Sequence, residues 1–397
     1  MKRVFLILCI ILTYPFVVSA QKAFKPVKSA LKSKNYHEVI KKVNALEHDS
    51  LFAGSSKLCL YKIEALRGLN DAENMKLYLK TKYDTVAFFS TTYQIITQTL
   101  RLDSIENQIS VQTNKKSKYS GQIKSLLNIY FPNMHAASRF FYLKKNYIES
   151  MKYLRICLDV PHMPVGINAG LSHKFDVNNA SLYLISAYQS KKYKEVHRYE
   201  SLSLQDTLVR SSILECLINT AEAENNIQKY LQWLRVAWYE FPQNKKFFTK
   251  LADYYAAQNN YQEVLTLANY QASKDSTDCV ASLAKCLALF NLEEFHECIQ
   301  EGRKLLAKDS AYVEAKYYIG ASYVAQGTAI EIPINALSNK YKEALEKQKF
   351  YYRLAQPFLE EYRQQKPNSP KRWAPLLYKI YLALNEGRKF EEIEKFL

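Results

Sequence analysis

The 397-residue sequence contains only 9 glycines. Tight turns between β-strands depend on glycine, so this scarcity argues against a many-stranded sandwich or barrel. After residue 20 there is no run of about 18 consecutive apolar residues, and we expect no membrane span in the mature chain. The length is too great for one ordinary core, which predicts several domains or a repeat array.

Sequence motifs of known catalytic sites are also missing. The sequence has no glycine-rich phosphate loop, no Gly-x-Ser-x-Gly nucleophile motif and no His-Glu-x-x-His zinc motif. His162 and His173 flank a loop-like insertion predicted over residues 161–174, but no acid or thiol is evident near them, so we expect no metal site. We therefore expect no catalytic activity and no cofactor. The alternative is an enzyme with an unrecognised site near these two histidines.

The first 20 residues differ in composition from the rest of the chain. Lys2 and Arg3 precede an apolar run over residues 4–12, and small residues lead up to Ala20. This order is typical of a secretory signal peptide cleaved near Ala20, with an uncleaved anchor as the alternative. We expect an exported protein, periplasmic or associated with the envelope of a Gram-negative cell. The beginning of the chain resembles that of exported proteins of Bacteroidetes-type bacteria.

The charge is strongly positive. The chain has 55 Lys and Arg against 38 Asp and Glu, a formal net charge of +17. These basic residues are spread along the sequence, which is typical of solvated surface, and we expect no binding to nucleic acid. The alternative is that the basic surface binds an anionic envelope polymer, such as lipopolysaccharide or a cell-wall glycan.

An internal repeat is the strongest pattern in the sequence. Tyr193, Ile227, Tyr261 and Phe295 are each 34 residues apart, and each opens an apolar-periodic segment that follows polar residues. Each period is therefore predicted to contain two helices joined by a tight polar turn. One such hairpin cannot bury its apolar face alone, so the hairpins must stack.

The repeat resembles the tetratricopeptide repeat (TPR) family. Residues 313–327, VEAKYYIGASYVAQG, match the family's first helix, with Ile319 and Gly320 at its large–small pair. Trp373 matches the family's aromatic position in the last helix pair. The resemblance implies an all-α, right-handed superhelical solenoid of stacked antiparallel helix hairpins.

The repeat register divides the chain into segments of different regularity. The expected segments are a signal peptide (1–20), degenerate N-terminal helical repeats (21–130), TPR-like repeats (131–312), a TPR-like repeat with an insertion at 328–350 (313–369) and a C-terminal capping helix pair (370–397). In the degenerate part, one hairpin is expected to turn at Asn35 and Tyr36, and the next near Gly68.

By the same resemblance, the first helices of the repeats line a concave groove that binds protein segments. Two neighbouring units have apolar residues at groove positions where earlier units are polar. The candidate partner-binding residues are Leu283, Leu287, Phe290, Tyr317, Ala321 and Val324. An exposed apolar groove indicates a protein or peptide partner, and hence a non-catalytic interaction scaffold or adaptor. Alternatively, the insertion 328–350 folds back and covers the groove with its own isoleucines.

Two cysteines fall on the small positions at which the helices of one repeat touch. These are Cys286 and Cys298. As reduced residues they would act as small apolar packing groups, like alanine elsewhere in the repeats. In an oxidising compartment they could form a disulfide if their Cα atoms lie within about 7 Å.

Overall fold

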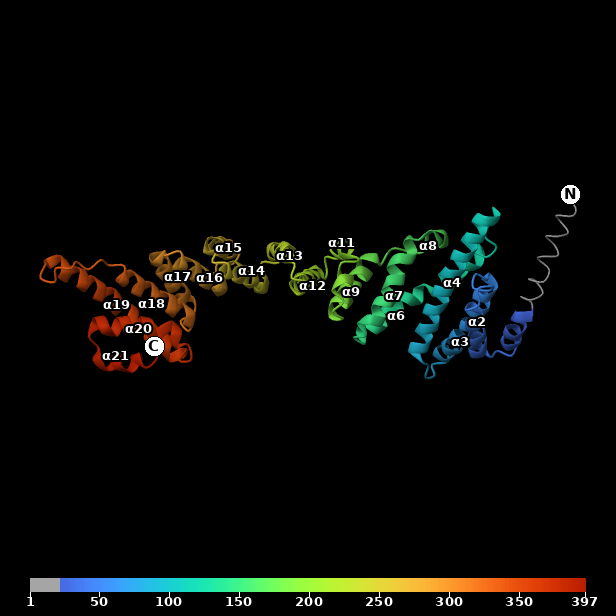
Figure 1. Ribbon diagram of the computed structural model, residues 1–397, viewed down its shortest axis with the longest axis horizontal. Coiled ribbons are helices and arrows are strands. Elements are labelled where there is room, and N and C mark those ends of the chain that lie inside the picture. Colours follow the sequence, from blue (N-terminus) through green and yellow to red (C-terminus); the bar gives the residue numbers. More distant parts are fainter. Residues whose placement is uncertain (1–21) are drawn as a thin grey trace. The chain divides into compact units, whose positions relative to one another are not determined.

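The computed structural model describes residues 22–397, and the regular elements in this range are all helices (Figure 1). This confirms the predicted all-α fold. The described chain falls into two compact units that divide between Asn225 and Asn226. The division lies inside the segment 131–312, which the sequence pattern treats as one array. The signal peptide expected over residues 1–20 lies outside the described residues.

The first unit, up to Asn225, is a series of helices that pack mainly on their neighbours in the chain, as α3 does on α4 and α6 on α7. Helical residues 22–32 begin it. Its further helices are α2 (Tyr36–Glu47), α3 (Ser56–Tyr78), α4 (Thr85–Thr113), α5 (Ser120–Tyr130), α6 (Pro132–Leu143), α7 (Tyr147–Asp159), the 3₁₀ turn η1 (Val160–His162), α8 (Pro164–Ala169), α9 (Asp176–Gln189), α10 (Tyr193–Val196), α11 (Glu200–Ser203) and α12 (Arg210–Ala223).

Two details of this unit differ from the sequence prediction. The turn expected near Gly68 is absent, because α3 continues through it. A Cβ atom at Gly68 would lie 2.2 Å from Cζ of Tyr36, so this glycine makes room for a neighbouring ring rather than ending a helix. The insertion at 161–174 is also not all loop, since it contains the end of η1 and the whole of α8.

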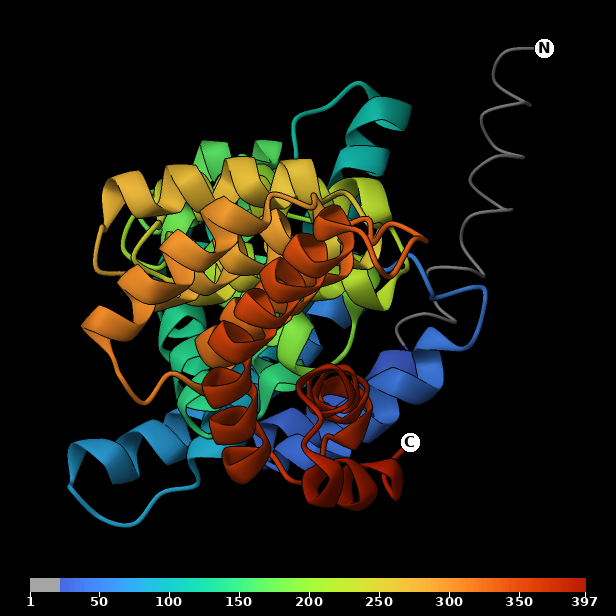
Figure 2. The ribbon, with the colours of Figure 1, turned by 90° about the vertical axis from the view of Figure 1, so that its left-hand side faces the viewer.

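The second unit, Asn226–Leu397, continues the same pattern. Its helices are α13 (Ile227–Glu240), α14 (Lys245–Ala257), α15 (Tyr261–Lys274), α16 (Cys279–Asn291), α17 (Phe295–Lys308), α18 (Val313–Thr328), α19 (Asn339–Gln365), α20 (Pro370–Leu384) and α21 (Gly387–Glu394). The insertion 328–350 forms a loop followed by the first turns of α19, which is one long helix in Figure 2. Ile319 and Leu359 are among the buried residues of a core that joins α18 to α20.

The turns within the hairpins explain the 34-residue period. Helices α10, α13, α15 and α17 begin at the four residues that define the repeat, which confirms the predicted helix starts. Two residues before each start, the backbone is left-handed, with φ of 56° at Lys191, 54° at Asn225, 54° at Asn259 and 62° at Glu293. A left-handed residue ends the first helix and reverses the chain within a very short turn. The polar residues at these positions are thus the structural basis of the repeat.

Glu293 offers a stability test of this turn. A left-handed conformation costs a residue with a side chain roughly 1–2 kcal/mol, and the greater backbone freedom of unfolded glycine offsets about 0.5–1 kcal/mol of that. We expect Glu293→Gly to raise the free energy of unfolding by about 0.5–1 kcal/mol in urea denaturation. The control Gln300→Gly, at an exposed position inside α17, should lower it by about 1 kcal/mol. Destabilisation by both glycines would contradict this account of the turn.

Candidate partner-binding site

Helix α16 has apolar residues on two faces, which is unusual for a helix of a soluble repeat. Its inward face is buried against neighbouring helices and includes Cys286 and Leu289. Its other face carries a stripe with helical spacing, three or four residues apart. The stripe consists of Val280, Leu283, Leu287 and Phe290, all half-buried. Unless something covers this second face, it forms an apolar surface in contact with water.

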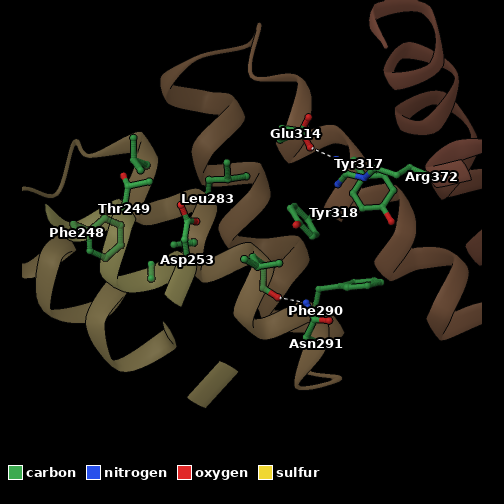
Figure 3. A pocket seen from close by; sticks show the side chains of 14 residues that line it. Phe248, Thr249, Asp253, Leu283, Phe290, Asn291, Glu314, Tyr317, Tyr318 and Arg372 are labelled. Atoms are coloured by element: carbon green, nitrogen blue, oxygen red, sulfur yellow. Dashed lines mark hydrogen bonds and ion pairs between the residues drawn. The ribbon is translucent and has the colours of Figure 1, made fainter. Parts of the chain in front are cut away.

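The stripe lines a cavity of about 510 Å³, here called the α16 cavity. Its walls come from α14, α16, α18 and α20, so the first helices of successive hairpins face the same space. Figure 3 shows Thr249 and Asp253 at one end, Leu283 in the middle, and Tyr317 and Arg372 at the other end. The size and apolar lining suit a few side chains of a bound segment.

At the end formed by α18 and α20, the wall of the α16 cavity is a charged and aromatic cluster. Arg372 donates a hydrogen bond from Nη1 to Oε2 of Glu314, at 2.7 Å. Its guanidinium group also stacks on Tyr317, 3.9 Å from the ring centroid. The ion pair satisfies both charges and the stacking orients the ring. This end is thus a preformed wall of the cavity.

At the opposite end, formed by α14, lies the carboxylate of Asp253. Asp253 makes no ion pair or side-chain hydrogen bond to any residue within the described range. Burial raises the pKa of its carboxyl group, although the residue as a whole is exposed. An unpaired carboxylate gains favourable Coulomb energy when a cation approaches. The α16 cavity therefore combines an apolar floor with one site suited to a positive group.

The predicted partner-binding residues divide into two groups. Leu283, Leu287, Phe290 and Tyr317 line the α16 cavity together. Ala321 and Val324 do not, since each is only 2% exposed. Val324 belongs to the core that joins α18 to α20, so packing within the chain already covers it.

The insertion does not cover the α16 cavity, contrary to the alternative considered from the sequence. No residue of 328–350 lines the cavity, and Ile334 is fully exposed. Ile332 is also exposed, and none of the three isoleucines of the insertion lines the cavity. The fourth wall comes instead from Arg372 of α20, a residue that sequence reasoning missed because it lies outside the repeat positions of the groove.

Cys286 and Cys298 lie at the contact between α16 and α17. Both are buried, both are free thiols, and Sγ of Cys298 is 3.4 Å from the carbonyl oxygen of Cys286. The hydrogen bond to Cys298, together with burial, raises the pKa of the Cys286 thiol. In this structure the two sulfurs are not bonded, and both residues fill small apolar positions between the helices.

The two histidines that flank the insertion do have an acidic neighbour, which corrects the sequence prediction. Nε2 of His162 lies 2.7 Å from Oδ2 of Asp176, at the start of α9. The sequence spacing of His173 and Asp176, three residues apart at a helix start, was the available signal. These residues belong to the first unit and have no part in the α16 cavity, which lies in the second.

Comparisons with known proteins give limited information. Neither a protein-family model nor a curated protein matches the sequence. The TPR domain of P58(IPK) aligns over 94% of this chain and 99% of its own, with 9% identity and a TM-score of 0.26. Yeast Tom70 aligns over 91% and 88%, with 11% identity and a TM-score of 0.31. The successive helix hairpins, with a 34-residue period from α10 to α17, make the fold TPR-like.

No helix within residues 22–397 is both long enough and apolar enough to cross a bilayer.

Proposed function

We propose that this chain is a non-catalytic interaction scaffold that binds a segment of another protein in the α16 cavity. The observation that carries the proposal is the uncovered apolar stripe on α16, which faces a preformed cavity instead of the interior of its own unit. Water contact with such a stripe is unfavourable, and a partner that buries it gains the hydrophobic free energy.

The chemistry of the walls defines the partner segment. One or two aliphatic or aromatic side chains would fill the space over Leu283, Leu287 and Phe290. A lysine or arginine beside them would pair with Asp253. We therefore propose an apolar anchor flanked by a basic residue. The same surface disfavours a segment with an acidic residue at that point, because two carboxylates would repel one another.

We further propose that the scaffold acts outside the cytoplasm, in the cell envelope. Support comes from the sequence of residues 1–20, with its basic start, apolar run and small residues before the expected cleavage point. Measuring the N-terminus of the protein isolated from its native envelope tests this part separately. An intact N-terminus starting at residue 1 would contradict cleavage near Ala20.

Peptide selection is the direct test of the cavity. The chain without its first 20 residues would be screened against a displayed library of random peptides, and enriched peptides measured by fluorescence anisotropy. We expect peptides that combine an aromatic or aliphatic residue with lysine or arginine. Leu283→Asp/Phe290→Asp should weaken them by about tenfold or more, because two carboxylates in an apolar contact cost well over the 1.4 kcal/mol that a factor of ten represents.

The matched control makes the same change of chemistry away from the cavity. Ile334→Asp/Leu337→Asp alters two exposed apolar residues of the insertion and should leave the affinity unchanged. Both double variants must show wild-type helicity by circular dichroism. Equal binding to wild type and the Leu283/Phe290 variant would contradict the proposal. Binding that survives this variant but falls steeply with added salt would instead favour the anionic polymer as ligand.

A further inference from the structure

Three potential metal ligands converge at the junction of η1, α8 and α9 in the first unit. They are His162, His173 and Asp176, and one ligand atom of each lies within 4.8 Å of the other two. The imidazole rings of the two histidines are stacked, with centroids 4.7 Å apart and planes 28° from parallel. His162 lies near the start of the insertion 161–174, His173 near its end and Asp176 just after it, so the fold brings the two ends of the insertion together.

The hydrogen bonding leaves this cluster ready for a cation. Among the described side chains of the cluster, one hydrogen bond is present, the 2.7 Å contact between His162 and Asp176. The backbone N–H of Asp176 also donates to the carbonyl oxygen of His173 at 3.0 Å. The His173 ring makes no hydrogen bond to any described residue, although its ring stacks on His162. The nearby cation Arg139 is directed elsewhere, with one guanidinium nitrogen 2.7 Å from Oδ1 of Asn178. A buried carboxylate and two imidazoles therefore lie within reach of one ion, and the ion pair of that carboxylate is with His162 itself.

The donor set is typical of a transition-metal site. Two imidazole nitrogens and one carboxylate oxygen suit Zn²⁺ and related divalent ions better than Mg²⁺ or Ca²⁺, which prefer oxygen. Zinc takes such donors at about 2.0–2.2 Å, so the ligand atoms must stand farther apart than they do in the 2.7 Å hydrogen bond. His162 is 57% exposed at its side chain and is free to make this small rotation.

We propose that His162, His173 and Asp176 bind one divalent transition-metal ion of the zinc class. Three protein ligands leave at least one position for water or for a group from a partner. The bound ion would join His162, near the start of the insertion 161–174, to His173 near its end and to Asp176 just after it. It would thereby clasp α8 onto the start of α9 and restrict the conformations of the segment between the two histidines.

Cobalt(II) is the probe that tests this site, because its visible absorption reports coordination directly. The protein would carry no polyhistidine tag and would be titrated with Co²⁺ and then with Zn²⁺ as competitor. We expect one equivalent of Co²⁺ to produce visible bands that Zn²⁺ removes. Thiolate-to-cobalt bands in the near ultraviolet should be absent, since the cluster contains no cysteine.

His173→Ala and His162→Ala are the decisive variants, because both side chains are exposed and their loss should leave the fold intact. Each should weaken binding by at least the roughly 10–100-fold that loss of a mere outer-shell partner costs. His197→Ala is the matched control. His197 also contacts two carboxylates, those of Glu200 and Glu224, but through opposite ring nitrogens, so they cannot share one ion with it.

The outcomes separate clearly. Loss of the cobalt bands in both site variants but not in His197→Ala supports the site. The proposal is overturned if wild type shows no stoichiometric visible bands, or if the double variant His162→Ala/His173→Ala takes up Co²⁺ as the wild type does. Neither result depends on peptide binding to the α16 cavity.

Discussion

Gly320→Val is expected to destabilise the second unit by about 3 kcal/mol, the upper end of the usual cost of overpacking. Gly320 of α18 packs directly against α19. A Cβ atom there would lie 2.6 Å from Cγ of Leu359 and 3.4 Å from the carbonyl oxygen of Ala355. Leu359 is fully buried and has no free space into which to move. Hydrogen exchange in α18 and α19 would measure the loss locally.

A glycine elsewhere provides the control for this prediction. Gly121 lies in α5 with no atom within 4 Å of the position that a Cβ would take. Gly121→Ala should therefore stabilise the helix by up to about 1 kcal/mol, the ordinary propensity difference. Leu359→Ala should also recover part of the loss in Gly320→Val by removing the clashing atoms. If Gly320→Val were as stable as wild type, the close helix contact would be wrong.

Trp373→Ala is expected to cost about 3–5 kcal/mol, as for other large aromatic residues removed from a core. The Trp373 side chain is 1% exposed, and its indole Nε1 donates to the carbonyl oxygen of Lys366 at 3.0 Å. The ring also packs edge-on against Phe396, with centroids 5.2 Å apart. Removing the ring leaves a cavity in the core, so α20 is packed less firmly against its neighbours. Faster hydrogen exchange in α20 and α21 would show this.

The same variant carries a functional consequence. Arg372 precedes Trp373 in α20 and forms a wall of the α16 cavity. Loosening α20 should therefore also lower the affinity for the peptides proposed above. Trp373→Phe keeps most of the apolar volume and loses only the indole hydrogen bond. We expect it to cost about 1–2 kcal/mol and to retain most of the affinity. Unchanged peptide affinity in Trp373→Ala would contradict the proposed link between the packing of α20 and the α16 cavity.

The sequence predicts the fold correctly where a helix boundary has a local physical cause. Left-handed residues and helix starts recur at the same places in each hairpin, so the 34-residue spacing predicts the helix boundaries of α10, α13, α15 and α17. The turn predicted near Gly68 was wrong, because glycine serves both in turns and at close contacts. The structure shows the Tyr36 ring lying over this glycine. Sequence periodicity does not distinguish a turn from a close contact.

The sequence predicts the α16 cavity only in part. The α16 stripe follows from helical spacing, and Leu283, Leu287 and Phe290 line the cavity as their register suggests. Ala321 and Val324 share that register but are covered by their own core, which spacing alone cannot reveal. Arg372 is a long-range addition, because the packing of α20 brings it to a cavity whose other walls come from earlier helices. Asp176 lies only three residues after His173, and that spacing was an available signal in the sequence.

The order of helix packing in the second unit also determines how it would carry a mechanical load. Its closely packed helix pairs are successive or next-but-one in the chain, so a pulling force would separate them one interface after another. A segment seated in the α16 cavity touches α14, α16 and α18 together and so bridges several of those interfaces. An occupied unit should therefore resist stretching more than an empty one, and extend over fewer, larger steps.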